Sequence, residues 1–291
     1  MSEKLVISLD IGGTNIDGAL VSSGADIVGE VHSIKSVSDQ SYDAAVANLL
    51  DFIRVVQAQT ELPIAACSIG MPRPFDYENG ISHMKHKFTS LYGKNIKEPL
   101  EDGLDVPVLF VNDADAFALG AYWKQVGNAG NLIGVTIGTG LGSGFIEDGR
   151  VVSSKNRVPE NGEIWDLPYR GGILEDFVSG KGIENIYRRS TGNSLPPKAI
   201  EDLAKQGDVG AQDAYREMGV ILGDGLALAC HNFVPDRVVI GGKLGRAAML
   251  FAEETSRQFH AGTGYDTRFV QAESELLALY GPAKYAFDLD T

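Results

Sequence analysis

Short apolar runs alternate with glycine-rich turns over the first part of the chain. The runs cover residues 5–9, 15–21 and 26–34, and the turns between them read GGT and SSGAD. Apolar runs of this length, bounded by glycine, serine and aspartate, are typical of β-strands joined by tight turns. The pattern therefore predicts an antiparallel meander of three strands at the start of the fold.

A helical pattern follows the meander. Apolar residues at positions 45, 46, 49, 50, 53 and 56 lie on one helical stripe. This spacing predicts a helix within residues 41–60, with either Asp39 or Ser41 as its N-cap. The remaining elements expected in this half are strands at 63–70 and 106–111, a long polar loop at 71–95, and a helix at 114–126 that ends near Gly127.

The second half repeats the order of strand, glycine turn and strand, and then becomes mainly helical. The expected strands and turn cover 131–137, 138–140, 141–149, 150–152 and 238–242. The expected helices lie near 172–190, 198–206, 208–232, 244–259 and 271–286, after an irregular segment at 152–172. Strands alternating with helices predict an α/β fold. We expect one domain over 1–115, joined by the C-terminal helix 271–291, and a second over 116–270.

Two glycine corners stand at the same place in the two halves, in SLDIGGT (8–14) and GVTIGTG (134–140). An offset of 126 residues aligns Ile11 with Ile137, Gly12 with Gly138, Gly18 with Gly144, and Leu20 with Ile146. A single corner of this kind is usually just a hairpin turn. A pair is more informative, because consecutive backbone N–H groups in such corners bind anions, and two of them could hold one polyphosphate. Neither corner fits a P-loop or a dinucleotide fingerprint.

Charge and composition narrow the possible partners. The net charge is −14 at pH 7, so a nucleic-acid backbone would be repelled over most of the surface. No apolar stretch approaches the ~20 residues that span a bilayer, and the start MSEKLVISLD lacks a secretory pattern. The two cysteines, Cys67 and Cys230, are too few for a disulfide framework or an all-cysteine zinc site. We expect a cytoplasmic protein that binds neither nucleic acid nor membrane.

Six segments resemble the ordered signature of the ROK family, which comprises sugar kinases and related repressors. They read LDIGGTNIDGALV, VNDADAFALGAYW, GVTIGTGLGSGFIEDGRV, GEIWD, GGILEDFVSG and VVIGGKLG, in this order along nearly the whole chain. The resemblance implies two similar ribonuclease-H-like domains, of the actin/hexokinase ATPase type, around an interdomain cleft. It also implies a sugar and ATP as small-molecule partners. Because the family is often dimeric, a homodimer is a further expectation.

On the ATP side, the resemblance implies contacts at both corners and at one later glycine pair. The implied ATP-binding residues are Asp10, Gly12, Gly13, Thr14, Asn15, Thr136, Gly138, Thr139, Gly140, Gly241 and Gly242. Asp10 would orient Mg²⁺ through water, although by itself it could be a turn former. Gly241 and Gly242 would lie near the adenosine, although a lone pair of glycines is more often just a tight strand-to-helix turn. The family usually has a lysine at the position of Asn15. This chain therefore lacks that cation near the phosphates.

Asp113 is the candidate general base. It follows the apolar strand VPVLFVN at the point where a helix begins, so position alone leaves open whether it acts as a base or only caps the helix. The resemblance implies the base. The sugar-binding residues that it implies are Gly70, Asn112, Asp113, Glu163, Asp166 and Glu175.

The stretch GEIWDLPYRGGILEDF departs from the family pattern. Asp166 stands where the family has a histidine that serves both zinc and sugar, and the cysteine-rich segment is missing. No zinc site is therefore expected, and packing would have to hold the shorter loop. Trp165 and Tyr169 are the candidates for this role, although both could equally be ordinary core residues. Arg73 replaces a glycine of the family and adds a cation near the sugar loop, where it could meet substrate, phosphate or Asp76.

The leading hypothesis from the sequence is an ATP- and Mg²⁺-dependent kinase of a hexose or N-acetylhexosamine, with the 6-OH as the acceptor. The alternatives are a sugar-binding regulator that does not transfer phosphate and a degenerate kinase, which the changes at Asn15 and Asp166 motivate. A different phosphate donor also stays open.

Overall fold

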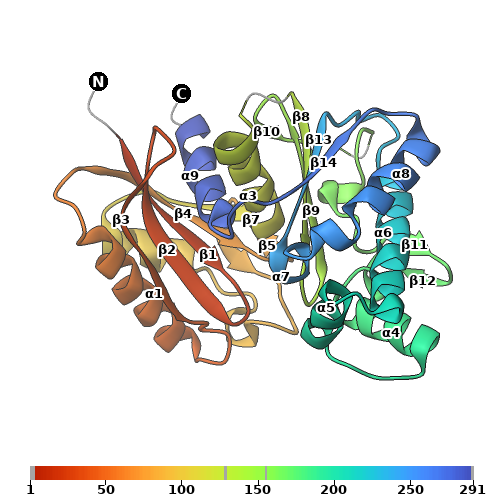
Figure 1. The fold of residues 1–291 in the computed structure, drawn as a ribbon. Helices are drawn as coiled ribbons and strands as arrows, with labels where there is room; N and C mark the ends of the chain where they lie inside the picture. The colour runs from red at the N-terminus through yellow and green to blue at the C-terminus, as the bar shows by residue number, and fades with distance from the viewer. Residues whose placement is uncertain (1–3, 128–129, 155, 290–291) are drawn as a thin grey trace. The chain divides into compact units, whose positions relative to one another are not determined.

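The computed structural model, described here for residues 4–127, 130–154 and 156–289, divides into two compact α/β units (Figure 1). The first unit runs through Lys124 and resumes at Leu276. The second unit comprises Gln125–Glu275. The dividing points thus lie somewhat further along the chain than the expected 115/116 and 270/271.

The first unit is built on a five-stranded sheet with the strand order β3-β2-β1-β4-β7. β1, β2 and β3 form an antiparallel meander, and β4 and β7 continue the sheet parallel to β1. The strands are β1 (Leu5–Ile11), β2 (Asn15–Ser22), β3 (Ile27–Lys35), β4 (Ile64–Met71) and β7 (Val108–Asn112), with a small separate hairpin of β5 (Phe75–Asp76) and β6 (Ile81–Ser82). The helices are α1 (Tyr42–Gln57), α2 (Lys97–Leu104), α3 (Asp113–Gly120) and α9 (Leu277–Leu289).

The apolar stripe of α1 packs against one face of this sheet. Leu49 and Phe52 of the helix belong to the same buried cluster as Ile7, Leu9 and Ile11 of β1. The N-cap is Ser41, whose side chain accepts a hydrogen bond from the N–H of Ala44. Of the two caps left open by the sequence, the structure therefore selects the serine.

The second unit repeats this topology with the order β10-β9-β8-β13-β14. Its sheet again combines an antiparallel meander with two parallel strands. The strands are β8 (Asn131–Ile137), β9 (Leu141–Glu147), β10 (Arg150–Val151), β13 (Arg237–Gly241) and β14 (Arg268–Gln271), with a separate hairpin of β11 (Pro168–Tyr169) and β12 (Gly172–Ile173). The helices are α4 (Gly180–Thr191), α5 (Pro197–Lys205), α6 (Val209–Ala229), α7 (Gly242–Gly245) and α8 (Ala252–Thr263).

The repeated glycine corners join the first two strands of each sheet. β8 has the bounds of β1 shifted by 126 residues, which confirms the alignment of Ile11 with Ile137 and of Gly12 with Gly138. The following strand is shifted by one residue, because the pairing leaves four residues, 12–15, in the first turn and three, 138–140, in the second. The alignments of Gly18 with Gly144 and of Leu20 with Ile146 are therefore wrong, and the structure aligns these residues with Ser143 and Phe145.

Three expected helices have different bounds in the structure, and a fourth, expected at 114–126, continues after α3 as a π-helix over Ala121–Val126. The helix expected near 172–190 begins at Gly180, since β12 and a 3₁₀ turn precede it. The helix expected near 244–259 is interrupted between α7 and α8. The helix expected near 271–286 begins at Leu277, because residues 268–271 form β14. β14 is a short edge strand whose ladder partner is β13, so its sequence carries little periodic signal.

No pattern in the sequence indicated α2. This helix contains Pro99 and Gly103, two residues that usually mark turns. Pro99 lies in the first turn, where a backbone N–H has no partner within the helix. The carboxamide oxygen of Asn95 accepts from the N–H groups of Lys97 and Glu98, at 2.8 and 3.2 Å. The Asn95 side chain thus provides hydrogen-bond acceptors for two backbone N–H groups at the start of α2.

Glycines allow α3 and α9 to approach each other closely in the first unit. A Cβ atom at Gly281 would lie 1.7 Å from the carbonyl oxygen of Ala116, and one at Gly120 would lie 1.8 Å from that of Leu277. The hydroxyl of Ser8 in β1 donates to the carbonyl of Leu279, at 2.5 Å. The C-terminal helix α9 is thus an integral layer of the first unit, and it packs against α3, the helix that begins at Asp113.

Candidate active site

The first glycine corner is closed by its own backbone and open on its outer side. The N–H of Gly12 donates to the carbonyl of Asn15, at 3.0 Å, and the N–H of Ser36 donates to that of Thr14, at 2.9 Å. A Cβ atom at Gly13 would meet no atom within 4 Å. An anionic oxygen can therefore reach the backbone here without displacing a side chain.

Asp10 stands just before this corner, in a region of concentrated negative charge. Burial is the main cause that raises its pKa to about 7, and the nearby carboxylates of Asp113 and Asp17 raise it further. Asp17 lies opposite Asp10 in β2, and Gly70 lies beside it in β4. A Cβ atom at Gly70 would lie 3.6 Å from a carboxylate oxygen of Asp10, so the glycine leaves room around this group.

Oxygen ligands of this kind fit Mg²⁺. The ion prefers carboxylates together with water and phosphate oxygens, and the accumulated charge around Asp10 would be offset by a cation. Over the part of the chain that the structure describes, no three His, Cys, Asp or Glu side chains converge in a metal-binding arrangement. Asp10 would therefore share the ion with water and phosphate ligands.

Asn112 and Asp113 stand at the junction of β7 and α3. Asn112 is the N-cap: its carboxamide oxygen accepts from the N–H groups of Ala114 and Asp115, at 3.1 and 3.2 Å. Its amide nitrogen donates to the carboxylate of Asp113, at 2.9 Å. Asp113 is the first helical residue, and burial is the main cause that raises its pKa. The helix does not depend on Asp113 as its cap, which leaves this carboxylate available for chemistry.

Side chains from the loop after β4 hold this junction in place. The guanidinium of Arg73 lies 3.0 Å from the carboxylate of Asp115. The hydroxyl of Tyr77 donates to the carbonyl of Met71, at 3.0 Å, and accepts from the amide nitrogen of Asn112, at 3.3 Å. Asp76 instead accepts hydrogen bonds within its own turn. Sequence reasoning did not single out Tyr77, which belongs to no motif, or Asp115, which lies in the segment VNDADAFALGAYW but was given no role there.

The second corner is tied to α4 and to Glu175. The N–H of Gly180 donates to the carbonyl of Gly138, at 2.8 Å. The N–H of Leu141 donates to the carboxylate of Glu175, at 2.8 Å, and a Cβ atom at Gly140 would lie 2.5 Å from that carboxylate. Thr139 is exposed at the tip of the turn. The structure thus brings Glu175, expected on the sugar side, against the second corner.

Gly241 and Gly242 lie alongside the same corner. Gly241 pairs with Thr136 across β13 and β8. Gly242 has a φ of 82°, and a Cβ atom there would lie 2.6 Å from the carbonyl oxygen of Ile137. The need for glycine at 242 is therefore steric as well as conformational.

Ser143 fixes the segment that carries Glu163. Its hydroxyl donates to the carbonyl of Gly162, at 2.6 Å, and accepts from the N–H of Ile164, at 3.1 Å. Glu163 is thereby held between two anchored residues, while Asp166 is exposed. Ser143 was not recognised from the sequence, where it reads as one residue of a glycine-rich strand.

Tyr169 holds the loop that follows. Its hydroxyl donates to the carboxylate of Asp224, at 2.6 Å, and its ring packs edge-on against Phe177. Burial and the Asp224 carboxylate raise the pKa of Tyr169 to about 12, so the hydroxyl stays protonated as a donor. The expectation that Trp165 packs in the same way is wrong, since this residue is 37% exposed.

Within the first unit the structure brings together Asp10, Gly70, Asn112, Asp113 and the corner 12–14. Within the second unit it brings together the corner 138–140, Glu175 and the pair Gly241–Gly242. Asn15 begins β2 as an exposed residue opposite Lys35. Among the described residues, no helix is both long and apolar enough to cross a membrane.

The two units have the same strand order, and each has a glycine corner between its first two strands. These features define an α/β protein of duplicated ribonuclease-H-like domains. A sequence model of the ROK family matches residues 6–273. The chain belongs to the ROK family.

Its relatives include sugar kinases. The chain is 25% identical over 288 residues to a glucokinase from Halalkalibacterium halodurans, covering 90% of this chain and 87% of that protein. It is 30% identical over 261 residues to an N-acetyl-D-glucosamine kinase from Escherichia coli O157:H7, covering 81% and 82%. A ROK family glucokinase from Streptomyces griseus, solved with glucose and AMPPNP, matches with a TM-score of 0.78 over 98% of this chain and 99% of that chain at 21% identity, which shows a shared fold.

Proposed function

We propose that this chain is an ATP-dependent sugar kinase that phosphorylates a hydroxyl, the 6-OH, of a hexose or N-acetylhexosamine. The observation that carries the proposal is the junction of β7 and α3, where Asn112 caps the helix and leaves the partly buried Asp113 carboxylate beside Asp10. The similarity to a glucokinase and an N-acetyl-D-glucosamine kinase supports this class of substrate.

Asp113 acts as the general base in this proposal. The sugar oxygen forms a bond to the γ-phosphorus of ATP, the bond from that phosphorus to the bridging oxygen breaks, and ADP leaves. Asp113 takes the proton of the sugar hydroxyl. Burial raises its pKa, which brings its basicity closer to that needed near neutral pH. Asn112, held by Tyr77, orients the carboxylate and the sugar.

The remaining roles follow from where each side chain stands. Asp10 would hold Mg²⁺, which neutralises phosphate charge when bound. The open corner at Gly12, Gly13 and Thr14 and the corner at Thr136, Gly138, Thr139 and Gly140 would bind the phosphates through backbone N–H groups. Gly241 and Gly242 would lie near the adenosine. Gly70, Glu163, Asp166 and Glu175 would contact the sugar.

Two further assignments remain proposals. Cys67 and Cys230 are buried free thiols, which suits a reducing compartment such as the cytoplasm. A homodimer is expected from the family alone, and analytical ultracentrifugation would test it.

The proposal is tested by an ADP-release assay with Mg²⁺ and ATP over a panel of hexoses and N-acetylhexosamines. We expect turnover on at least one sugar and a loss of about 10²-fold or more in Asp113→Asn, because the variant lacks the base. Asp102→Asn, an exposed carboxylate change on α2, serves as the control and should keep full activity. Saturable sugar binding without turnover on any sugar would instead identify a sugar-binding regulator.

A further inference from the structure

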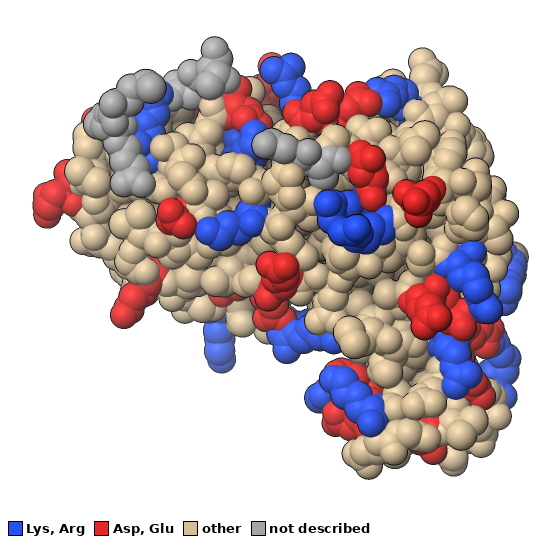
Figure 2. Space-filling model, turned by 45° about the horizontal axis from the view of Figure 1, so that its top comes forward, with Lys and Arg blue, Asp and Glu red and all other residues tan. Residues whose placement is uncertain are grey.

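Binding a phosphoryl group in the first unit requires a local positive charge. On the face shown in Figure 2, acidic and basic side chains are interspersed. The first corner, Gly12 to Asn15, contains no basic side chain. Asp10, Asp17 and Asp113 add negative charge close to it.

A pocket of about 180 Å³ lies beside this corner, entirely within the first unit. Its lining residues are Gly13, Ser38, Asp39, His86, Lys87, Phe88 and Thr89. The volume is below the ~300–1,000 Å³ of a site for a whole small molecule. It is equivalent to ~6 waters at the ≈ 30 Å³ that each occupies in the liquid, and therefore fits a single group of phosphate size.

Phe88 anchors the basic side of the pocket. Its side chain is 1% exposed and belongs to the core cluster of the first unit. Its backbone adopts a left-handed φ of 49°, which is uncommon for a residue of this size. The buried ring fixes the loop, so Lys87 and Thr89 are held on either side of it.

Lys87 lines this pocket, and its ammonium is a cation available to an anion there. Its charge lies close enough to Asp113 to lower the pKa of that carboxyl, as does the charge of Arg73. Arg73 already forms an ion pair with Asp115. Lys87 is exposed, and within the described ranges its ammonium forms neither an ion pair nor a hydrogen bond to the protein.

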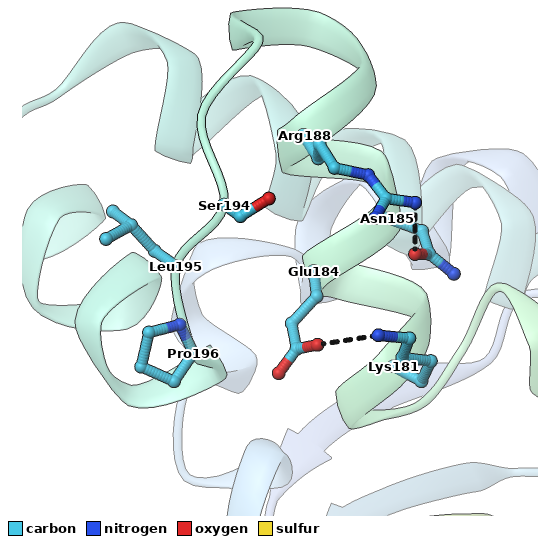
Figure 3. Close-up of a pocket in the computed structure, with 7 residues that line it drawn as sticks. All are labelled: Lys181, Glu184, Asn185, Arg188, Ser194, Leu195 and Pro196. Carbon is cyan, nitrogen blue, oxygen red and sulfur yellow. Dashed lines mark hydrogen bonds and ion pairs between the residues drawn. The ribbon is translucent and has the colours of Figure 1, made fainter.

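The larger pocket of the second unit offers a contrast. It measures about 250 Å³ and lies between α4 and the segment that precedes α5 (Figure 3). Its basic groups already have partners: Lys181 lies 3.3 Å from the carboxylate of Glu184, and Arg188 donates to Asn185 at 3.0 Å. Lys87 is not committed in this way.

We propose that the pocket of the first unit is an anion site, in which the Lys87 ammonium and the Gly13 backbone bind oxygens of the phosphoryl group that is transferred. This inference rests on the proposed function and adds a binding residue from the loop before α2. Lys87 neutralises charge on the phosphoryl group as it passes to the sugar oxygen, in a corner that has no cation of its own. The phosphates of ATP and of the phosphorylated product share this chemistry.

Binding of inorganic tripolyphosphate, measured by calorimetry without sugar, tests the site independently of turnover. Lys87→Met should weaken binding by about tenfold or more, the effect of losing a charge-assisted contact. Lys85→Met, which removes the same charge two positions earlier in the loop, should change it by less than about twofold. Equal binding by wild type and Lys87→Met would overturn the proposal.

Steady-state kinetics give the second measurement. On the sugar that wild type uses, Lys87→Met should lower kcat/KM for ATP on the order of 10²-fold, and Lys87→Arg should recover most of that loss. A change confined to the KM of the sugar would contradict the assignment, since it would place Lys87 on the sugar instead. If wild type turned over no sugar, the proposed function would fail, and the tripolyphosphate comparison would still decide whether the anion site exists. Unchanged melting temperatures would show that the variants are folded.

Discussion

At the scale of single residues, Asp10 and Asp113 show how one environment acts on two carboxylates. Burial is the main cause of the raised pKa in both, and the Asp113 carboxylate raises the pKa of Asp10 further. Asp113 also accepts a hydrogen bond from the N–H of Ala114 and is near Lys87, both of which lower its pKa. The carboxylates of Asp113 and Asp17 act on Asp10 in the opposite direction and raise its pKa. The raised pKa of Asp10 means that ionisation of this carboxyl opposes folding when no cation is bound.

A pH-dependent stability follows for Asp10. Its pKa in the folded chain is about 7, against an ordinary value of 3.8, so the unfolded chain releases this proton first. The free energy of unfolding therefore decreases as pH rises from about 4 to about 7. Without divalent cations, Asp10→Asn should be more stable than wild type at pH 8 by ~1–3 kcal/mol, since each pKa unit corresponds to about 1.4 kcal/mol and partial exposure reduces the sum.

Urea denaturation across this pH range checks the expectation. The advantage of Asp10→Asn should shrink towards pH 5, and Mg²⁺ should stabilise wild type more than the variant. Asp266→Asn, at an exposed position, is the control. An advantage that stays constant from pH 5 to pH 8 would contradict the raised pKa.

At the scale of elements, glycine determines how close the backbones come. Gly120 and Gly281 bring α3 and α9 together so tightly that neither position has space for a methyl group. The one-residue difference between the two corners is a second example, because the shorter turn places Ser143 where the first unit has Gly18. That serine then anchors the segment of Glu163. The turn that is one residue shorter thus gives the second unit a hydrogen-bonding serine at the strand position where the first unit has a glycine.

Gly281→Ala should destabilise the first unit strongly. The added methyl group would meet backbone atoms of Ala116, and backbone cannot move aside as a side chain can, so we expect a loss of at least ~2–3 kcal/mol. Gly24→Ala, whose new Cβ would make only ordinary contacts, should change stability by less than ~1 kcal/mol. Chemical denaturation of both variants measures the difference. Similar losses in the two would rule out close packing of α3 and α9 as the cause.

At the scale of the whole molecule, the duplication is uneven in the chain. The second unit is one continuous segment, while the first unit needs residues from both ends of the chain. α9 packs on α3, β1 and β4, and Ser8 donates to its backbone. The second unit has a buried cluster of its own. The stability of the first unit should therefore depend on α9, and the stability of the second unit should not.

A chain that ends at Glu275 should lose the fold of the first unit. Without α9, the apolar faces of α3, β1 and β4 would be exposed to water. Hydrogen exchange measured by mass spectrometry should show protection lost in β1, β4 and α3 and retained in β8 and β13. A chain that ends at Leu289 is the control. Slow hydrogen exchange of β1 in the shorter chain would contradict the view that the first unit needs α9 to fold.

Apart from the roles of Asp10 and Asn112, which came from the family resemblance, the sequence alone indicated the α/β class, the strands around both glycine corners, the helical stripe of α1 and the candidate base Asp113. These features have local signals: apolar runs bounded by glycine, a period of 3.6 residues, and polar residues at the end of a buried strand. The order of the motifs also pointed to the ROK family, which the match over residues 6–273 confirms.

The folded structure was needed to establish the strand register, the edge strand β14, the helix α2, and that Asn112 and not Asp113 caps α3. It alone showed the raised pKa of Asp10, the ion pair of Arg73 with Asp115 and the approach of Lys87 to the first corner. The physical reason is the same in each case. Pairing, burial and charge act between residues that are distant in sequence, and a side chain's partners are fixed only when the sheet and its loops bring them together.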